Sequence, residues 1–531
     1  MNLTFLNWIL AFSPVLVVLI LMLGLRWGGS KAGAAAWFVA VIVSMVAFGA
    51  GPRLIAVAQA KSILLTLDVL LIIWTALLLF HVADEAGAVR IIGERLPDLT
   101  ADRMMQAILL SWVFVSFLQG MGGFGVPVAV VAPLLVGLGF GPIQAVIMAS
   151  IGHGWAVSFG SLATSYMALL ATTGLPGEAI APDASLLLGI GAFFSGAIVA
   201  YLGSGWKGLL RGLPAIVVLT LVMGTVQAAL AIHGLWTLGA TGASLAGLVV
   251  GVGLTRIPIY QKMHDDGNQT AEDDQPNGES ISNNDGKKRS LWIALSAYAV
   301  LIVLAFAINL IPALKELFNS VKVTLQFPAV ATSFGWETPA EAGRKLSLFG
   351  HPGAILLYTS LIAYAIYQRA GYYQPGAAKR ILRKMARGAV SSSLGIAAMV
   401  GMATIMSHAG MTNLLARGIS ESVGASIYPA FAPIIGALGA FMTGSNTNSN
   451  VVFGQLQQQT AQLLGLSVTL IVAGQTAGGA LGSVLAPAKV IVGCSTVGLG
   501  GNEGKVIGRM LILGLIPVAV VALATWLLAT F

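Results

Sequence analysis

Long apolar runs follow one another along almost the whole chain, and they limit what it can fold into. A helix needs about 20 apolar residues to cross the hydrocarbon core of a bilayer. Backbone at membrane depth must satisfy its own polar groups, so such runs are expected to be helical. Sixteen runs can be marked, at residues 5–25, 30–50, 62–83, 104–119, 125–140, 142–172, 184–204, 213–233, 236–256, 290–312, 353–369, 389–408, 425–443, 446–465, 467–489 and 506–530. Several of the middle runs are short or interrupted, which favours half-spans or re-entrant hairpins.

Composition supports a membrane protein. Of the 531 residues, 57% are hydrophobic and 9% are charged, whereas soluble globular proteins average about 25% charged residues. We therefore expect an all-α polytopic membrane protein with about 12–16 membrane segments, whose main partner is the lipid bilayer. The net charge of +8 does not indicate nucleic-acid binding, because the basic residues occupy short loops between apolar runs. That distribution is how orientation is encoded in membrane proteins.

Charged loops predict the orientation and the domain boundaries. Clusters of Lys and Arg follow runs 5–25, 184–204 and 353–369 and precede run 290–312. If all four clusters are cytoplasmic, both termini lie outside. Residues 257–289 have the composition of a disordered linker, which we place in the cytoplasm between a membrane half at 1–256 and another at 290–531. The loop at 313–352 is then outside, with an amphipathic stretch at 314–323.

A shift of 322 residues, which lays Gly122 on Gly444, brings the two halves into register without gaps. Gly152 then falls on Gly474, and Ser161 falls on Ser483. The apolar runs also coincide in pairs, and in the predicted topology each first-half run crosses in the opposite direction to its partner. Inverted repeats of this kind are typical of secondary transporters, whose binding site lies between the repeats near the middle of the membrane.

Two interruptions of the apolar pattern are candidate transport sites. The first contains Gly122, Gly123, Phe124 and Gly125 followed by Pro127, and such a sequence does not support a regular helix. The second is a polar run from Gly444 through Ser445, Asn446, Thr447 and Asn448 to Asn450. These side chains are costly in hydrocarbon unless they line a cavity or pair with each other. The alternative is a pair of close helix contacts made by small residues.

The two breaks predict an anion site. Ser and Asn are preferred helix N-caps, and a helix N-terminus offers free N–H donors and partial positive charge, which suit a carboxylate. Two such ends meeting in the membrane would bind an anion without a fixed cation. Asn and Thr side chains would add partners for a hydroxyl group. We therefore expect a small hydroxylated monocarboxylate, or another small organic anion, as the substrate.

Four further residues are candidates because of where they lie. Asp68 lies deep in an apolar run, where a carboxylate is costly and is a functional candidate by default; we assign it to proton coupling, with a partnered structural carboxylate as the alternative. His153 falls on Gln475 under the shift, and both are assigned to the border of the site, although a buried His is as often structural. Lys489 is assigned to contact with the anion, or its side chain extends to the membrane interface instead.

At these residues the chain resembles the lactate permease family of bacterial carriers. The resemblance rests on Gly123–Val128 with the LLVGLGF run, on Thr443–Gly454, and on Gly478–Ser483 continuing through Lys489 to Leu499. It covers most of the chain, with departures at Val126 and at His153–Trp155. It implies proton-coupled uptake of lactate and glycolate across the cytoplasmic (inner) membrane of a bacterium, by a carrier without a cofactor or metal.

Other functions stay open at this point. Unwound polar backbone coordinates Na⁺ as readily as it binds an anion, so a sodium-driven carrier or a carrier for another organic anion is the nearest alternative. A channel or a membrane-embedded enzyme belongs to a different class. An enzyme is not expected, because the sequence contains no HExxH or GxSxG motif. Whether the carrier forms a homo-oligomer is left open.

Overall fold

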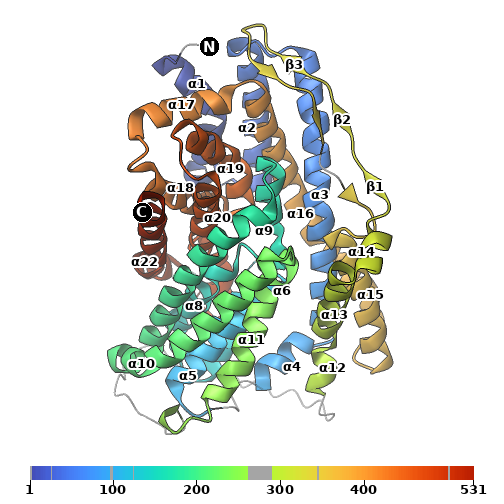
Figure 1. Cartoon of the computed structure of the whole chain (residues 1–531). Coiled ribbons are helices and arrows are strands. Elements are labelled where there is room, and N and C mark those ends of the chain that lie inside the picture. Colours follow the sequence, from blue (N-terminus) through green and yellow to red (C-terminus); the bar gives the residue numbers. More distant parts are fainter. Residues whose placement is uncertain are drawn as a thin grey trace.

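The computed structural model describes residues 3–25, 27–95, 100–123, 125–260, 290–343, 346–499 and 503–531. Within these residues the protein is a bundle of helices with one long β-hairpin along its side (Figure 1). The predicted linker lies outside the described residues from position 261 onward. Its prediction as a disordered segment, and the division into halves based on it, stay predictions.

The number of membrane segments agrees with the sequence. Among the described residues, nine helices are long and apolar enough to cross a membrane, or up to eleven if each of two bent helix pairs counts as one span. The shorter apolar helices Val126–Gly137 and Tyr428–Thr443 raise the number to thirteen, inside the predicted range. Exposed apolar side chains such as Phe38, Val46, Leu221 and Ile512 indicate lipid-facing surfaces.

Within its described residues the first half contains eleven α-helices, several joined by short turns of another helical type. They are α1 (Phe5–Leu19), α2 (Gly29–Ala47), α3 (Pro52–Glu85), α4 (Ala88–Arg95), α5 (Arg103–Ile108), α6 (Val115–Met121), α7 (Val126–Gly137), α8 (Pro142–Gly152), α9 (Gly160–Thr173), α10 (Gly177–Ile232) and α11 (Gly239–Leu254). The π-helical turns η1 (Ile20–Gly24) and η3 (Leu109–Phe114) and the 3₁₀ turns η4 (Gly154–Ala156), η5 (Trp236–Leu238) and η6 (Pro258–Tyr260) lie between or beside them.

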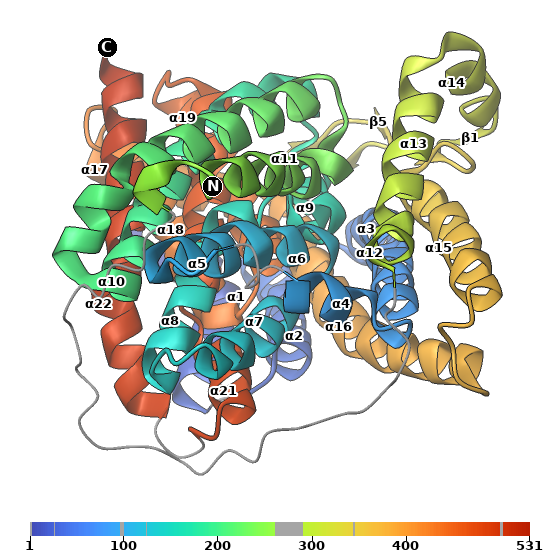
Figure 2. The ribbon, with the colours of Figure 1, turned by 90° about the horizontal axis from the view of Figure 1, so that it is seen from below.

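The second half repeats the pattern after a short insertion. Its helices are α12 (Leu291–Ala294), α13 (Ser296–Leu310), α14 (Pro312–Phe318), α15 (Pro352–Arg369), α16 (Ala377–His408), α17 (Met411–Val423), α18 (Tyr428–Thr443), α19 (Asn446–Leu463), α20 (Val468–Ser483), α21 (Pro487–Thr496) and α22 (Glu503–Thr530). Figure 2 shows α13, α14 and α15 at one edge of the molecule and α10 and α22 at the opposite edge.

The loop after α14 adds short strands to the predicted all-α fold. After α14, six two-residue strands form an antiparallel hairpin: β1 (Lys322–Val323) pairs with β6 (Leu346–Ser347), β2 (Gln326–Phe327) with β5 (Glu341–Ala342), and β3 (Val330–Ala331) with β4 (Glu337–Thr338). The hairpin runs up the side of the molecule to the end where the N-terminus lies (Figure 1). Its short, polar segments carried too little alternating pattern to predict strands.

Helix α10 is a helical hairpin rather than one straight rod. Gly205 has φ 66° and follows Ser204 at a break in the helical dihedral angles. The two ends of α10 meet, since a Cβ on Gly234 would lie 3.3 Å from Glu178 Oε1. The chain therefore crosses the bundle twice within α10, as runs 184–204 and 213–233 predicted.

The inverted repeat is visible as matching elements. Adding the shift of 322 residues moves α2 onto residues 351–369 and α3 onto residues 374–407, where α15 (Pro352–Arg369) and α16 (Ala377–His408) lie. In the same way α7 falls on α19, and the start of α10 falls on α22. Helices α3 and α16 run antiparallel, because Gln59 Nε2 donates to Gly401 O at 3.4 Å while Trp74 Nε1 donates to Ser393 Oγ at 2.9 Å.

Two helical hairpins, α5–α6/α7 and α18/α19, lie in the bundle, and each includes a helix too short to cross a membrane, Val126–Gly137 or Tyr428–Thr443. The hairpin α5–α6/α7 opens toward the end where Thr100 Oγ1 donates to Tyr260 O and Asp102 pairs with Arg211 at 2.8 Å. The hairpin α18/α19 opens toward the other end, where Gln455 Nε2 donates to Ser407 Oγ at 2.8 Å near the end of α16. At the first tip Gly122, Gly123 and Gly125 are buried, and at the second tip Thr443, Gly444 and Ser445 are half-buried.

Candidate functional site

A short segment between the two tips brings them together. Helices α8 and α9 are bent by 50° at a break, and the residues around this break touch both hairpins. Gly123 N of the first tip donates to Ser161 Oγ at 2.8 Å. Beyond the second tip, Asn446 Nδ2 donates to Ser158 Oγ at 3.1 Å, and the Thr447 and Ser165 hydroxyls lie 3.1 Å apart. Both predicted breaks therefore belong to one interior region.

The second break is a capped helix N-terminus, as predicted. Gly444 has φ 69°, which reverses the chain after α18. Ser445 is the N-cap of α19, and its hydroxyl accepts a hydrogen bond from Asn448 N at 3.3 Å. The N–H groups of Asn446 and Thr447, at the first two helical positions, have no acceptor within the helix. They point out of the positive end of α19.

Four polar side chains form a buried cluster beside this N-terminus. Asn446 and Asn450, one turn apart on α19, both face Thr476 of α20. Asn450 Nδ2 donates to Thr476 Oγ1 at 2.9 Å and to Ser165 O at 3.0 Å. Ser158 Oγ donates to Thr476 O at 2.9 Å. Each of these residues is buried, and none carries a net charge. The cluster can therefore bind through amide and hydroxyl groups only.

Three Asn side chains at the start of α19, two in this cluster and one on the opposite face of the helix, have acceptor atoms without a partner. The Oδ1 atoms of Asn446, Asn448 and Asn450 are buried without a hydrogen-bond partner among the described residues. Buried polar atoms are normally hydrogen-bonded. These three oxygens are therefore suited to a hydroxyl or acid proton of a ligand, or to a cation.

The first break contributes mainly close packing. A Cβ on Gly122 would lie 2.9 Å from the Phe80 ring, and one on Gly123 would lie 2.5 Å from Ser161 Oγ. Gly125 has φ 87° and precedes α7, which has Pro127 in its first turn. Gly122 N donates to Leu118 O at 2.9 Å, so the N–H groups of Gly122 and Gly123 are used by the protein itself. Phe124 lies outside the described residues.

Backbone strain is concentrated at the bridging segment. Ser161, Leu162 and Ala163 have φ angles of 46°, 58° and 63°, the left-handed region that L-residues avoid at a cost of roughly 1–2 kcal/mol each. Strain of this kind persists only where the surroundings enforce it, and it gathers at functional sites. Ser161 contacts the first tip, and Ser158 and Ser165, on either side of the strained residues, contact the start of α19, which supports placing the site here.

Gln475 lies in a neighbouring polar layer. Its Nε2 donates to Ser449 Oγ at 3.0 Å, and its Oε1 accepts from Gln457 Nε2 at 3.0 Å. Tyr428 extends this chain by donating to Gln457 Oε1 at 2.5 Å. Gln475 precedes Thr476 of the cluster, and its side chain contacts α19 of the second hairpin. Its place at the border of the site stays a prediction.

The other two border residues are placed differently. His153 is buried, and its Nδ1 lies 2.7 Å from Ala149 O of its own helix, which is the structural alternative that the sequence left open. Lys489 is half-buried at the break between α20 and α21, where its Nζ donates to Ser483 Oγ at 3.2 Å. Ser483 is the repeat partner of Ser161, so Lys489 lies beside the second half's counterpart of the strained segment.

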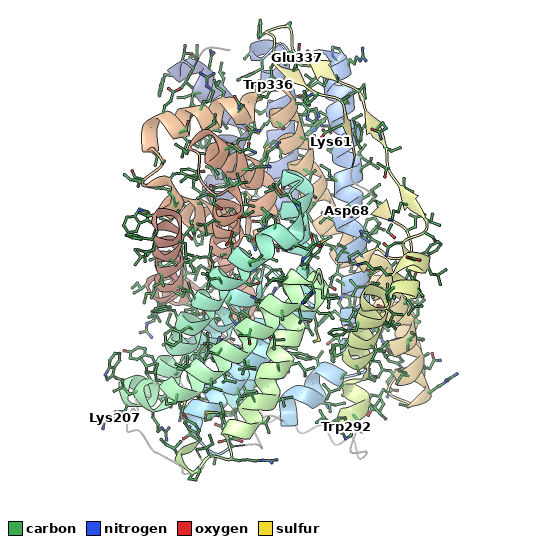
Figure 3. All side chains as sticks on the ribbon, in the orientation of Figure 1. Lys61, Asp68, Lys207, Trp292, Trp336 and Glu337 are labelled. Carbon is green, nitrogen blue, oxygen red and sulfur yellow. The ribbon has the colours of Figure 1, made fainter. Side chains whose placement is uncertain are left out.

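Asp68 has a partner that sequence reasoning missed. The carboxylate is 2% exposed, and its Oδ1 lies 2.8 Å from Nε2 of His351, which is also buried. Figure 3 places Asp68 near mid-height of α3, below Lys61. His351 follows the outer β-hairpin and precedes α15, so it escaped a search restricted to apolar runs. Ser158, Ser161, Ser165 and Thr476 were also missed, although their hydroxyls interrupt two long runs.

Comparison with known proteins identifies the family. The model of the family described as L-lactate permease matches residues 7–531. The chain belongs to the L-lactate permease family. Its relatives include an L-lactate permease of Bacillus subtilis, 26% identical over 90% of this chain and 88% of that one. Glycolate permease GlcA of Escherichia coli is 26% identical over 98% of this chain and 95% of its own.

The comparison with solved structures gives weaker support for a family than the comparison of sequences. The Alcanivorax borkumensis YdaH transporter aligns over 90% of this chain and 87% of its own, with a TM-score of 0.47 and 14% identity. These values are too low to assign a family, so the assignment rests on the sequence match. Because the family's members are named permeases, the chain is a membrane transporter and not an enzyme.

Proposed function

We propose that this permease carries lactate and glycolate, and related 2-hydroxymonocarboxylates, together with protons. The observation that carries the proposal is the capped N-terminus of α19 inside the repeat interface, next to an uncharged cluster of Asn, Ser and Thr side chains. Relatives named L-lactate permease and glycolate permease support the choice of substrate.

In this proposal the substrate carboxylate binds the free N–H groups of Asn446 and Thr447. A helix N-terminus supplies about half a positive charge, and hydrogen bonds to a charged group are about twice as strong as neutral ones. The substrate hydroxyl then donates to an unpartnered amide oxygen, such as Asn446 Oδ1 or Asn450 Oδ1. We assign Gly122, Gly123, Phe124 and Gly125 to the opposite wall, with Ser445, Asn448, Gln475, His153 and Lys489 around it.

Asp68 is the proposed proton carrier. It lies mid-way along a membrane helix with a buried carboxylate, and such a group exchanges one proton with a small change in its surroundings. Asp68 lies outside the Asn cluster, on the face of α3 that meets His351. Coupling then acts through movement of α3 and α15 relative to the two hairpins rather than by direct contact with substrate.

Sodium coupling is the second candidate, and one observation favours it. Two buried amide oxygens without partners, Asn446 Oδ1 and Asn450 Oδ1, lie one turn apart on the same face of α19 and are the neutral oxygen atoms that coordinate hard cations. In a sodium-driven carrier they would bind the ion beside the substrate carboxylate.

Uptake into proteoliposomes decides between the two. Labelled L-lactate and glycolate are supplied under a pH gradient, a Na⁺ gradient, both, or neither. We expect accumulation with an inward proton gradient alone. Accumulation only with a Na⁺ gradient would establish the second candidate, and failure of both substrates to compete with each other would reject a shared 2-hydroxy acid site.

We further propose the orientation that the loop charges indicate. Both termini lie outside and the linker lies in the cytoplasm of a bacterial cell, with the protein in the cytoplasmic membrane. Lys207 and Trp292 lie at one end of the molecule, while Trp336 and Glu337 lie at the other (Figure 3). The larger share of basic loop residues at the first end supports this assignment.

A further inference from the structure

Helix α2 begins at an N-cap residue that has no side chain. Gly28 is this N-cap, and the first N–H groups of a helix have no acceptor within the helix itself. In the second half the matching helix α15 is capped, because the His351 side chain accepts from Gly353 N. The start of α2 therefore offers N–H donors and the positive end of a helix dipole.

A buried amide of α19 faces this end of α2. Asn448 is 9% exposed, and a Cβ on Gly29 would lie 3.6 Å from its Nδ2 atom. Among the described residues, Asn448 Oδ1 is buried without a hydrogen-bond partner. Because buried polar atoms are normally hydrogen-bonded, an amide oxygen left unused at this place indicates a ligand that donates to it.

This amide does not belong to the cluster around Thr476. Asn446 and Asn450 both direct their side chains to Thr476, and they lie one turn apart on α19. Asn448 is two residues from each of them, which turns its side chain by about 200° around the helix axis. The start of α19 therefore has polar side chains on two faces, and the second face is the one that meets α2.

The charges around this meeting point favour an anion. A Cβ on Gly29 would also lie 3.8 Å from Met399 Cε, so α2, α16 and α19 come together here. None of these three helices contains an Asp or a Glu, whereas Lys31 lies in the first turn of α2. A cation would meet a helix N-terminus without any carboxylate to compensate it, while an anion meets only donors and positive charge.

Close packing of small residues explains only part of this arrangement. Gly33, one turn further along α2, is needed for packing, because a Cβ there would lie 3.2 Å from Ala398 Cβ. At Gly28 a Cβ would meet nothing within 4 Å. Gly28 and Lys31 are also exposed. The start of α2 is therefore open, and packing does not require its N-cap to be a glycine.

We propose that the N-terminus of α2 and the amide of Asn448 form a second binding position for the 2-hydroxymonocarboxylate. The substrate occupies it between the Thr476 cluster and the basic loop before α2. The inference rests on the proposed function, because it adds a position for the same substrate. In the proposed orientation this loop is cytoplasmic, so the second position is the last one before release into the cell.

The groups at this position match both ends of a 2-hydroxy acid. The carboxylate accepts from the N–H groups at the start of α2 and from Asn448 Nδ2, and hydrogen bonds to a charged group are about twice as strong as neutral ones. The hydroxyl donates to Asn448 Oδ1. A carboxylate without the hydroxyl leaves this buried oxygen unpaired, which disfavours its binding.

Two substitutions remove the second position in different ways. Gly28→Asp places a carboxylate of the protein at the start of α2, where it takes the place of the substrate carboxylate. Its matched control is Gly51→Asp, because Gly51 is the N-cap of α3 and a Cβ there also meets nothing within 4 Å. Asn448→Leu removes both amide atoms at similar volume. Gln459→Leu, about three turns further along α19, is the control for that change.

The measurement is equilibrium binding of labelled L-lactate to the purified full-length carrier in lipid nanodiscs, together with thermal unfolding. Gly28→Asp and Asn448→Leu should each bind about half as much L-lactate at saturation as the wild type, and the remaining half should keep its affinity. Gly51→Asp and Gln459→Leu should bind the wild-type amount. Because Asp is a preferred N-cap, Gly28→Asp and Gly51→Asp should melt no lower than the wild type.

Three results would overturn the inference. Wild-type saturation of Gly28→Asp with unchanged affinity shows that the start of α2 binds no substrate. Wild-type saturation with weaker affinity shows a single position that the new charge affects from a distance. Wild-type binding by Asn448→Leu removes the amide from the site. Failure of the proposed function looks different, because the wild-type carrier itself then binds no L-lactate, and the second position falls with it.

Discussion

Single residues of the site act through hydroxyl and amide groups rather than through charge. Thr476 is the central one, since its hydroxyl and carbonyl accept from Asn450 and Ser158. These bonds join α19, α20 and the bridging segment. The polar cluster therefore fixes the relative position of the two repeats as well as offering groups to a ligand, so changes at this residue should affect both stability and transport.

Thr476→Val keeps the shape and removes the hydroxyl. We expect a loss of roughly 1–3 kcal/mol in unfolding free energy, because a buried amide donor loses a partner, and several-fold weaker apparent affinity for lactate. Thermal unfolding in detergent and uptake kinetics measure both. Thr525→Val is the matched control, since the Thr525 hydroxyl donates to Val521 O of its own helix. Equal effects of the two substitutions would contradict a special role for Thr476.

Gly123→Ala tests the close packing of the first tip. The added Cβ would lie 2.5 Å from Ser161 Oγ and 3.0 Å from Gln119 Nε2, so the bridging segment must move. We expect transport to fall at least tenfold, with destabilisation of about 1–3 kcal/mol. Gly224→Ala in α10 is the control, because a Cβ there meets nothing within 4 Å. Normal uptake by Gly123→Ala would show that the first tip tolerates displacement.

At the scale of helices, the breaks in the helices supply the polar groups of the proposed site, a role that charged side chains have in many other anion sites. The first tip is buried and the second is half-buried, and the break between α8 and α9 holds three left-handed residues. Only the second tip combines a free helix N-terminus with polar side chains. The first tip uses its N–H groups on Leu118 and Ser161. The two breaks thus occupy matching positions of the repeat, but they differ in the polar groups that they offer to a ligand.

Ser445→Asp separates helix capping from anion binding. Asp and Asn are both good N-caps, but Asp adds a negative charge at the proposed carboxylate site. We expect Ser445→Asp to fold with nearly unchanged melting temperature and to lose lactate uptake, while Ser445→Asn keeps both. Lactate uptake and the melting temperature are measured for the two variants under the same conditions. Comparable uptake by Ser445→Asp and Ser445→Asn would place the substrate carboxylate elsewhere.

At the scale of the whole molecule, the repeat places matching long helices of the two halves against each other. Helices α3 and α16 cross as an antiparallel pair, held by Gln59, Trp74 and the contact of Arg380 with Glu85. Large buried clusters pack around this pair, one of them shared by α1, α2, α3, α16 and α17. Movement of one hairpin against this frame is the kind of motion that alternating access needs.

Labelling of single cysteines tests the orientation. In a Cys494→Ser background, which removes the one native thiol, cysteines replace Thr4, Thr530 or Lys207. A membrane-impermeant maleimide should label the first two in intact cells and the third only after permeabilisation, because basic loops stay in the cytoplasm. Labelling of Lys207→Cys in intact cells would invert the proposed orientation.

The sequence by itself determined the membrane environment, the helical class, the internal repeat and the places where helices break. These follow from local properties: the length of apolar runs, the positions of glycine and proline, and the cost of polar residues in lipid. The shift of 322 residues that lays Gly122 on Gly444 also lays α3 on α16. The N-cap at Ser445 could be predicted from the identity of this side chain and of its neighbours in the sequence.

Only the tertiary structure decided which residues meet. Ser158 and Ser165 lie far from Asn446 and Thr447 in sequence, and His351 is separated from Asp68 by the outer hairpin and most of the first half. Such contacts depend on how the two repeats pack, which no local pattern encodes. Because of the same packing, His153 Nδ1 lies next to Ala149 O of its own helix. The N–H groups of Gly122 and Gly123 at the first break donate to Leu118 O and Ser161 Oγ. Hydrogen-bond partners are therefore a property of the assembled repeats, while the positions of the breaks are a property of the sequence.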